Sequence, residues 1–157
     1  TLARAAIAGL DLRAVYPELD AKRTLGEVLL EPTRIYVEPI MKLLGQYRVK
    51  KVVSGMAHIT GGGIGGNLCR SICGTVDATV HLDRWEVPSI FPFLQQHGNI
   101  ETEEMFKVFN MGIGYVLIVR PAFADSITSH LQQLGEAPVV LGEITKGTGK
   151  VHLVSGK

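Results

Sequence analysis

The residue pattern best suited to chemistry is a glycine-rich segment, residues 57–70, with the sequence AHITGGGIGGNLCR. Its five glycines fall within six positions, and the missing β-carbons allow a ligand to approach the backbone. The segment follows a strand-like run, Val49 to Met56, and leads into a short predicted helix, whose N-terminal N–H groups would face an anion. His58 precedes the glycines, and Asn67 and Arg70 lie three positions apart on the predicted helix. We expect backbone donors, imidazole and guanidinium to converge on a phosphate-bearing ligand.

The sequence excludes two better-known phosphate-binding loops. No Lys-Ser or Lys-Thr closes the glycine run, as a Walker loop requires. The G-x-G-x-x-G spacing of dinucleotide sites is absent, and so is the acidic residue that follows it. Taken alone, the turn fits a purely structural role as well as it fits anion binding. A lone histidine such as His58 is more often a packed strand-end residue than a catalyst.

Length and composition indicate one globular domain. The chain has 157 residues, of which 46% are hydrophobic and 20% charged, with a net charge of +1. This charge predicts no affinity for nucleic acid or for membranes, and no apolar run approaches membrane-spanning length. Cys69 and Cys73 are expected four apart on the helix after the glycines, as reduced, packed thiols of a cytoplasmic protein, and we expect no metal site. Because the chain opens with Thr1 inside an apparent helix, we interpret it as a fragment of a longer protein.

Hydrophobic periodicity and breaker residues predict an α/β protein of the α+β type, with a mixed, largely antiparallel sheet flanked by helices. The predicted helices are Leu2 to Ala8, Ile35 to Tyr47, Ser89 to His97, one that begins at the acidic cluster 101–104, and Pro121 to Leu134. The predicted strands are Leu25 to Leu30, Val49 to Met56, Val76 to Leu82, Tyr115 to Val119 as a central strand, and Val139 to Ile144 with Val151 to Val154 as a hairpin.

Several stretches together resemble one family. Residues 26–37, GEVLLEPTRIYV, resemble the opening of the C-terminal domain of phosphoribosylformylglycinamidine cyclo-ligases, also called aminoimidazole ribonucleotide synthetases. Residues 58–70 resemble the signature H-[IL]-T-G-G-G-x-x-x-N-[IL]-x-R of that family. The same pattern continues in order through Pro88-Ser89-Ile90-Phe91, Leu94-Gln95, Gly98-Asn99, Glu104-Met105 and Phe109-Asn110-Met111-Gly112-Ile113-Gly114. The resemblance covers nearly the whole chain.

This resemblance implies a single C-terminal domain, residues 1–157, of a two-domain, cytoplasmic ligase of purine biosynthesis. The enzyme family closes the imidazole ring of formylglycinamidine ribonucleotide with ATP and Mg²⁺, which are bound mainly by an N-terminal domain absent from this chain. The implied partners are the ribonucleotide substrate, that N-terminal domain, and a second copy in a homodimer. The isolated chain is expected to be inactive.

The resemblance also implies roles for individual residues. Five of them would hold a phosphate, either the 5′-phosphate of the ribonucleotide or one transferred from ATP: Thr60, Gly61, Gly62, Gly63 and Asn67. His58 is the candidate catalytic residue, as an acid, a base or a phosphoryl-stabilising group, with a structural strand-end role as the alternative. Arg70 would pair with phosphate or with a carboxylate across the domain interface.

Further residues match the family motifs with less defined roles. Thr33, Arg34 and Tyr36 would face the interdomain cleft, or, for Tyr36, only pack. Asn110, Gly112 and Gly114 would let the backbone approach a ligand or, as the favoured reading, a neighbouring strand.

The sequence departs from the family pattern at two positions, and other functions stay open. Cys69 stands where the family often has Pro, and Gly66 where it often has an acid, so the resemblance implies that a contact made by that carboxylate in some members is weakened here. The alternatives are another ATP-dependent member of the same superfamily and a non-catalytic domain that binds a phosphate ligand.

Overall fold

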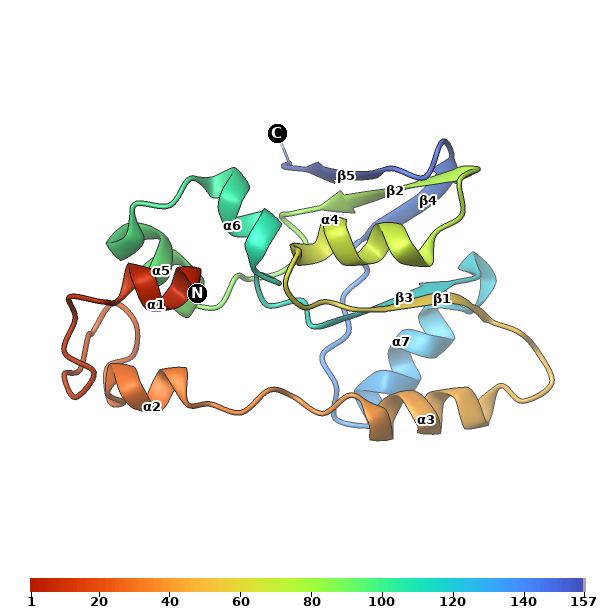
Figure 1. Ribbon diagram of the computed structural model, residues 1–157. Coiled ribbons are helices and arrows are strands. Elements are labelled where there is room, and N and C mark those ends of the chain that lie inside the picture. The colour runs from red at the N-terminus through yellow and green to blue at the C-terminus, as the bar shows by residue number, and fades with distance from the viewer. Residues whose placement is uncertain (157) are drawn as a thin grey trace.

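The computed structural model describes residues 1–156, and its centre is a stack of four layers (Figure 1). Helix α4 (Gly63–Leu68) lies between a two-stranded ribbon and a three-stranded sheet. The ribbon consists of β1 (Val53–His58) and β3 (Tyr115–Val119), and the sheet of β2 (Val76–His81), β4 (Gly142–Lys146) and β5 (Val151–Val154). Two helices, α3 (Val37–Gln46) and α7 (Ala124–Gln133), cover the other face of the ribbon.

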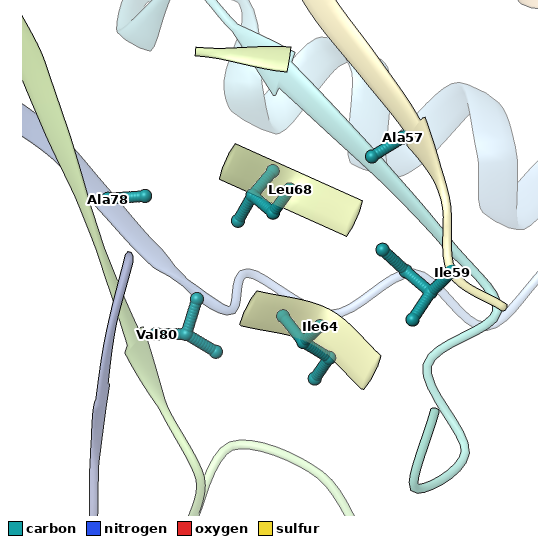
Figure 2. Packing of buried hydrophobic residues seen from close by; sticks show 6 residues of the cluster. All are labelled: Ala57, Ile59, Ile64, Leu68, Ala78 and Val80. Atoms are coloured by element: carbon teal, nitrogen blue, oxygen red, sulfur yellow. The ribbon is translucent and has the colours of Figure 1, made fainter. Parts of the chain in front are cut away.

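Packing, rather than intrinsic propensity, holds helix α4 in place. Three of its six residues are glycines, the residue type that disfavours a helix most after proline. Ile64 and Leu68, four positions apart, are 0% and 3% exposed. Figure 2 shows both side chains between the ribbon and the sheet, where they contact one buried cluster. The other buried members of that cluster are Ala57, Ile59, Ala78 and Val80.

The three-stranded sheet has the order β4-β2-β5, so the predicted hairpin is wrong. Strand β2 lies between the two C-terminal strands, antiparallel to β4 and parallel to β5. The connection from β4 to β5 therefore crosses the end of β2. There the Asp77 carboxylate accepts hydrogen bonds from the backbone N–H groups of Thr148 and Lys150, at 2.7 and 2.8 Å. This side chain replaces the hydrogen bonds that a tight hairpin turn would have supplied.

The predicted fold class is confirmed, but the strands are divided between two sheets. Within residues 1–156, four of the five strands take part in antiparallel pairs, and only the β2–β5 pair is parallel. Strand β3 has one neighbour, β1, so the prediction of a central strand is wrong. Its unbroken apolar run is explained by layers on both faces, since Val116 and Ile118 pack towards α4 while Leu117 and Val119 pack towards α3 and α7.

The remaining helices form a lobe beside the layers (Figure 1). They are α1 (Leu2–Ala6), α2 (Leu25–Leu29), α5 (Ile90–Gly98) and α6 (Thr102–Val108). The segment Leu25 to Leu30, predicted as extended, is the helix α2. Thr24 caps it by accepting the Glu27 N–H, and the Glu27 carboxylate accepts the Thr24 N–H in return. This Ser/Thr-x-x-Glu pattern was the sequence signal for a helix start.

Two boundaries near the glycine-rich segment differ from the prediction. Strand β1 begins at Val53 rather than Val49, and α4 ends at Leu68, after which the chain forms a short 3₁₀ turn, η1 (Cys69–Ser71). Cys69 and Cys73 therefore do not share a helix. Both are free thiols and exposed, so the expectation that they are packed is wrong. A second 3₁₀ turn, η2 (Pro121–Phe123), precedes α7.

Candidate functional site

The glycine turn between β1 and α4 has a backbone conformation that excludes side chains at its centre. Gly62 and Gly63 have φ angles of +99° and +62°, in the left-handed region. A β-carbon on Gly63 would overlap the carbonyl oxygen of Phe106, and would come within 3.1 Å of the Phe109 carbonyl oxygen. Gly63 therefore brings the turn directly against the end of α6. At Gly61, by contrast, a β-carbon would meet open space.

The side chain of Asn67 stabilises the turn by hydrogen bonds to its backbone carbonyls. The side chain is 7% exposed, and its Nδ2 donates to the carbonyl oxygens of Thr60, Gly61 and Gly63, at 3.3, 3.2 and 2.8 Å. These carbonyls point inward to the amide. In this arrangement Asn67 shapes the turn, and direct contact of its side chain with a phosphate stays a prediction.

Several backbone N–H groups of the turn have no backbone acceptor within residues 1–156. Gly63 donates its N–H to Thr60 and Gly66 donates to Gly62. Within residues 1–156, no backbone acceptor pairs with the N–H groups of Gly61, Gly62, Ile64 or Gly65. Unpaired donors at a strand-to-helix turn can bind an anion such as a phosphate, which accepts several hydrogen bonds at once.

A second loop lies against the glycine turn. The Ile59 N–H donates to the Gly114 carbonyl at 2.9 Å, which extends the β1–β3 pairing past the end of the ribbon. The loop turns tightly at Met111 and Gly112, with φ angles of +51° and +99°, and the Asn110 carboxamide oxygen accepts the Gly112 N–H. The structure therefore brings the predicted residues Asn110 and Gly112 into a loop that adjoins the glycine turn.

Trp85 supports this second loop, a role that sequence reasoning did not find. Its indole N–H donates to the Met111 carbonyl at 2.9 Å. Met111 is 4% exposed, so burial and this hydrogen bond hold a non-glycine residue in the left-handed region.

His58 is exposed at the last position of β1 and lies within a cluster of three rings, Tyr36, His58 and Tyr115. Ala57 and Ile59 pack towards α4, and strand alternation therefore directs His58 to the opposite face of the ribbon. Tyr36, the residue before α3, reaches the cluster because Gly114 has no β-carbon, which would overlap the Tyr36 hydroxyl. Tyr115 was not among the predicted residues.

The two predicted arginines and Thr33 are not gathered at the glycine turn. Arg70 lies in η1, seven residues beyond Gly63, which corresponds to about 10 Å along a helix axis. Arg34 forms an ion pair with Glu136, Nη2 to Oε2 at 3.0 Å, near the end of α7. Thr33 is exposed in the segment that joins α2 to α3.

Two surface pockets lie away from the glycine turn. One, of about 230 Å³, lies between α3 and α7 and is lined by Gln46, Tyr47, Ser126, Ser129, His130 and Gln133. The other, of about 270 Å³, adjoins the start of α3 and is lined by Ile35, Glu38, Pro39, Lys42, Leu134 and Glu136. Neither of these two pockets is lined by a residue of the predicted site.

Two further observations apply to residues 1–156. No three His, Cys, Asp or Glu side chains are grouped closely enough to hold a metal ion. None of the helices in this range combines the length and the apolar character needed to cross a membrane.

Comparison with known proteins confirms the resemblance noted in the sequence. Residues 4–154 match the family described as AIR synthase related protein, C-terminal domain. The chain is 47% identical over 130 residues to the phosphoribosylformylglycinamidine cyclo-ligase of Alkaliphilus metalliredigens, covering 83% of this chain and 36% of that protein. Identity is 45% over 141 residues with the enzyme of the same name from Bacillus velezensis, covering 90% and 39%. With that of Neisseria gonorrhoeae it is 43% over 140 residues, covering 87% and 40%.

The matches extend along almost the whole chain but only along part of the relatives. The chain spans about two fifths of the length of the curated relatives it matches. The matched part includes both the glycine turn and the loop that adjoins it. The chain therefore belongs to the family of AIR synthase related proteins, in its C-terminal domain.

Proposed function

We propose that this chain is the C-terminal domain of an ATP-dependent cyclo-ligase that converts formylglycinamidine ribonucleotide into aminoimidazole ribonucleotide. The relatives quoted above carry the name of that enzyme. The observation on this chain that supports the proposal is the glycine turn, where four backbone N–H groups are unpaired within the described residues and the inner carbonyls are held by Asn67.

The proposed role of the turn is to bind a phosphate. Ring closure by this enzyme family uses ATP to phosphorylate the formyl oxygen, after which the amidine nitrogen attacks the same carbon and phosphate leaves. Backbone donors fixed in space suit either the 5′-phosphate of the ribonucleotide or a phosphoryl group from ATP, because both present several acceptor oxygens. His58, exposed next to the turn, is the proposed acid, base or phosphoryl-stabilising group.

The other predicted residues have supporting roles in this proposal. Asn110 and Gly112 shape the loop beside the turn. Thr33, Arg34 and Tyr36 belong to the segment that leads into α3, on the surface that we propose faces the rest of the enzyme. Arg70 would contact a phosphate or a carboxylate of the other domain.

An exposed apolar strip is the surface that we propose packs against the N-terminal domain. Its members lie before and along α3, and their exposed fractions are large: Leu30 82%, Ile35 77%, Val37 69% and Met41 62%. Side chains of this type seldom stay exposed together on a protein surface. The same domain would supply most contacts to ATP and Mg²⁺, and we assign no metal ligand to this chain. The homodimer and the cytoplasmic location are further parts of the proposal.

Calorimetric titration of the protein with formylglycinamidine ribonucleotide, ribose 5-phosphate and ATP tests the role of the turn. The titrations are repeated with Asn67→Ala, which removes the amide that shapes the turn. Gln96→Ala is the matched control, because it removes an exposed amide of α5 that has no side-chain partner within residues 1–156.

Each outcome of the titration has a defined meaning. Binding of the ribonucleotide and ribose 5-phosphate, weakened by Asn67→Ala and unchanged by Gln96→Ala, supports a site for the substrate phosphate. Binding of ATP alone would assign the turn to the nucleotide. Absence of binding with all three ligands would contradict a preformed phosphate site on this chain.

A further inference from the structure

The candidate catalytic group, His58, is exposed and contacts two aromatic rings, and within residues 1–156 its imidazole has no polar partner. The His58 ring is stacked on Tyr115, with centroids 6.1 Å apart and an interplanar angle of 28°. Tyr36 approaches the His58 ring at 5.8 Å and 64°, and approaches Tyr115 at 5.4 Å. These separations lie within the range at which aromatic pairs attract one another. Each of the three rings is therefore in contact with the other two.

The strand pairing explains why His58 and Tyr115 meet. They are direct partners in the antiparallel ribbon, so their side chains leave the same face at the same level. Tyr36 comes from a different part of the chain and closes the cluster over Gly114. Within residues 1–156, no hydrogen bond or ion pair to the imidazole of His58 accompanies these contacts.

Stacking restrains the orientation of an imidazole and leaves its two nitrogens free to donate or accept hydrogen bonds. The two nitrogens of the ring lie on its edge, and a stacked neighbour covers only a face. A hydrogen bond to either nitrogen would also fix the ring, but it would occupy a donor or acceptor that a substrate needs. An exposed histidine with neither restraint would sample several rotamers and lose that freedom on binding a ligand.

The geometry points to Tyr115 as a positioning residue, which sets the orientation of the His58 imidazole, with Tyr36 as its second aromatic neighbour. This inference rests on the proposed function, because the proposed catalytic role of His58 explains why a fixed ring orientation is useful. The restraint itself can be measured without any ligand.

Nuclear magnetic resonance of the ligand-free protein tests the restraint. The ring protons of His58 are compared in wild type, Tyr115→Phe and Tyr115→Leu. Wild type and Tyr115→Phe should show the shifts and cross-relaxation of a histidine held over an aromatic ring. In Tyr115→Leu the His58 signals should move to positions typical of an exposed, freely rotating ring. His152, an exposed histidine of β5, is the control and should not change.

The outcomes separate a positioning role from a structural one. Because loss of the Tyr115 ring current alone moves the His58 shifts, the deciding readout is the Hα–Hβ coupling of His58, which reports its side-chain rotamer. A single-rotamer coupling retained in Tyr115→Leu would overturn the inference, and so would a loss of the stacked signature in Tyr115→Phe while the His152 signals stay in place. If Tyr115→Leu does not fold, Tyr115→Met, with an unbranched side chain, is measured in its place against the same criteria.

Ligand binding gives a second, independent readout. Ribonucleotide affinity should fall about 2- to 13-fold in Tyr115→Leu, the factor that corresponds to one aromatic pair, and should be retained in Tyr115→Phe. In the double variant with His58→Ala, Tyr115→Leu should add no further loss, because both changes remove the same positioned ring. An additive loss would overturn the inference. A wild-type protein that binds no ribonucleotide would contradict a substrate-phosphate site on this chain, and the signals of His58 would then decide the positioning role alone.

Discussion

At the scale of single residues, the glycine turn depends on one amide and one missing β-carbon. The Asn67 amide faces three carbonyl oxygens, and Gly63 faces the carbonyl of Phe106. Both residues were predicted from the sequence as phosphate-binding. In the structure both residues shape the backbone of the turn, Asn67 through three hydrogen bonds and Gly63 through its close approach to the Phe106 carbonyl.

Replacement of Asn67 is expected to be costly because Asn67 is itself buried and so is its hydrogen bond to the Gly63 carbonyl. Asn67→Ala leaves carbonyl oxygens without a donor, and we expect a loss of about 1–3 kcal/mol in the free energy of unfolding. Asn67→Asp should lose more, because a carboxylate would face the same three oxygens. Denaturant unfolding monitored by circular dichroism measures both, with Gln96→Ala as the control. Equal stability of Asn67→Asp and wild type would contradict the hydrogen-bond assignment.

Gly63 and Gly61, two glycines of the same turn, should respond differently to substitution by alanine. Gly63→Ala combines a left-handed φ with overlap of the Phe106 carbonyl, and we expect a loss of about 2 kcal/mol or more. Gly61→Ala has open space and should change stability by about 0.5 kcal/mol or less. Thermal unfolding of the two variants under one buffer condition checks this. A pair with equal melting temperatures would show that the turn can relax.

At the scale of elements, the crossing of β2 by the β4–β5 connection depends on a carboxylate. Hydrogen bonds from the backbone N–H of Lys150, then of Thr148, and from the His152 ring hold the pKa of Asp77 well below its usual range. A lowered pKa in the folded state means that the contribution to stability is fully present above the unfolded pKa of about 3.9. The contribution is lost as the pH falls below that value.

Asp77→Asn should therefore remove a pH-dependent part of the stability. We expect the variant to be less stable than wild type at pH 7, and the difference to shrink as the pH falls from about 5 towards 2. Denaturant unfolding at a series of pH values measures it. Glu86→Gln is the control and should follow the wild-type curve, because Glu86 is an exposed carboxylate in the segment between β2 and α5, outside any helix. A constant difference across the whole range would contradict the role of the Asp77 charge.

Local sequence patterns predicted most of the helices and strands. The errors arose in segments whose structure is determined by tertiary contacts or by a helix cap that the sequence reasoning overlooked. The alternation from Val76 to Leu82 predicted β2 well. The prediction of a hairpin was wrong because the local sequence around Gly147 cannot show that a distant strand, β2, lies between β4 and β5. The prediction of an extended segment at α2 was wrong for a different reason. The capping box formed by Thr24 and Glu27 is visible in the sequence but was overlooked.

The candidate site was predictable to a similar degree. Glycine spacing located the turn and the adjoining loop, because both need residues with φ above zero. The contact between His58 and Tyr115 was not predictable, because it depends on the register between two strands that are far apart in the sequence. The same limit applied to Arg34, whose ion pair with Glu136 joins distant segments.

At the scale of the whole molecule, the apolar strip before and along α3 predicts association of the chain when it is studied alone. Ile35→Lys should lower the tendency to self-associate and the binding of a hydrophobic dye, because it places a charge within the strip. Val49→Lys is the matched control, since Val49 is 98% exposed in the segment between α3 and β1, outside the strip. Sedimentation velocity over a range of concentrations measures the difference. Equal association of both variants would contradict a role for the strip.

The position of β2 between β4 and β5 also determines when the protein can finish folding during its synthesis. A nascent chain that has reached residue 141 contains β2 with neither edge paired. Unpaired strand edges recruit other strands, so this interval is the one in which aggregation on the ribosome is most expected. Both edges of β2 are paired only after residues 142–154 have left the ribosome and formed β4 and β5 on either side of it. Slow translation just before residue 142 would lengthen that exposure, and fast translation through the last two strands would shorten it.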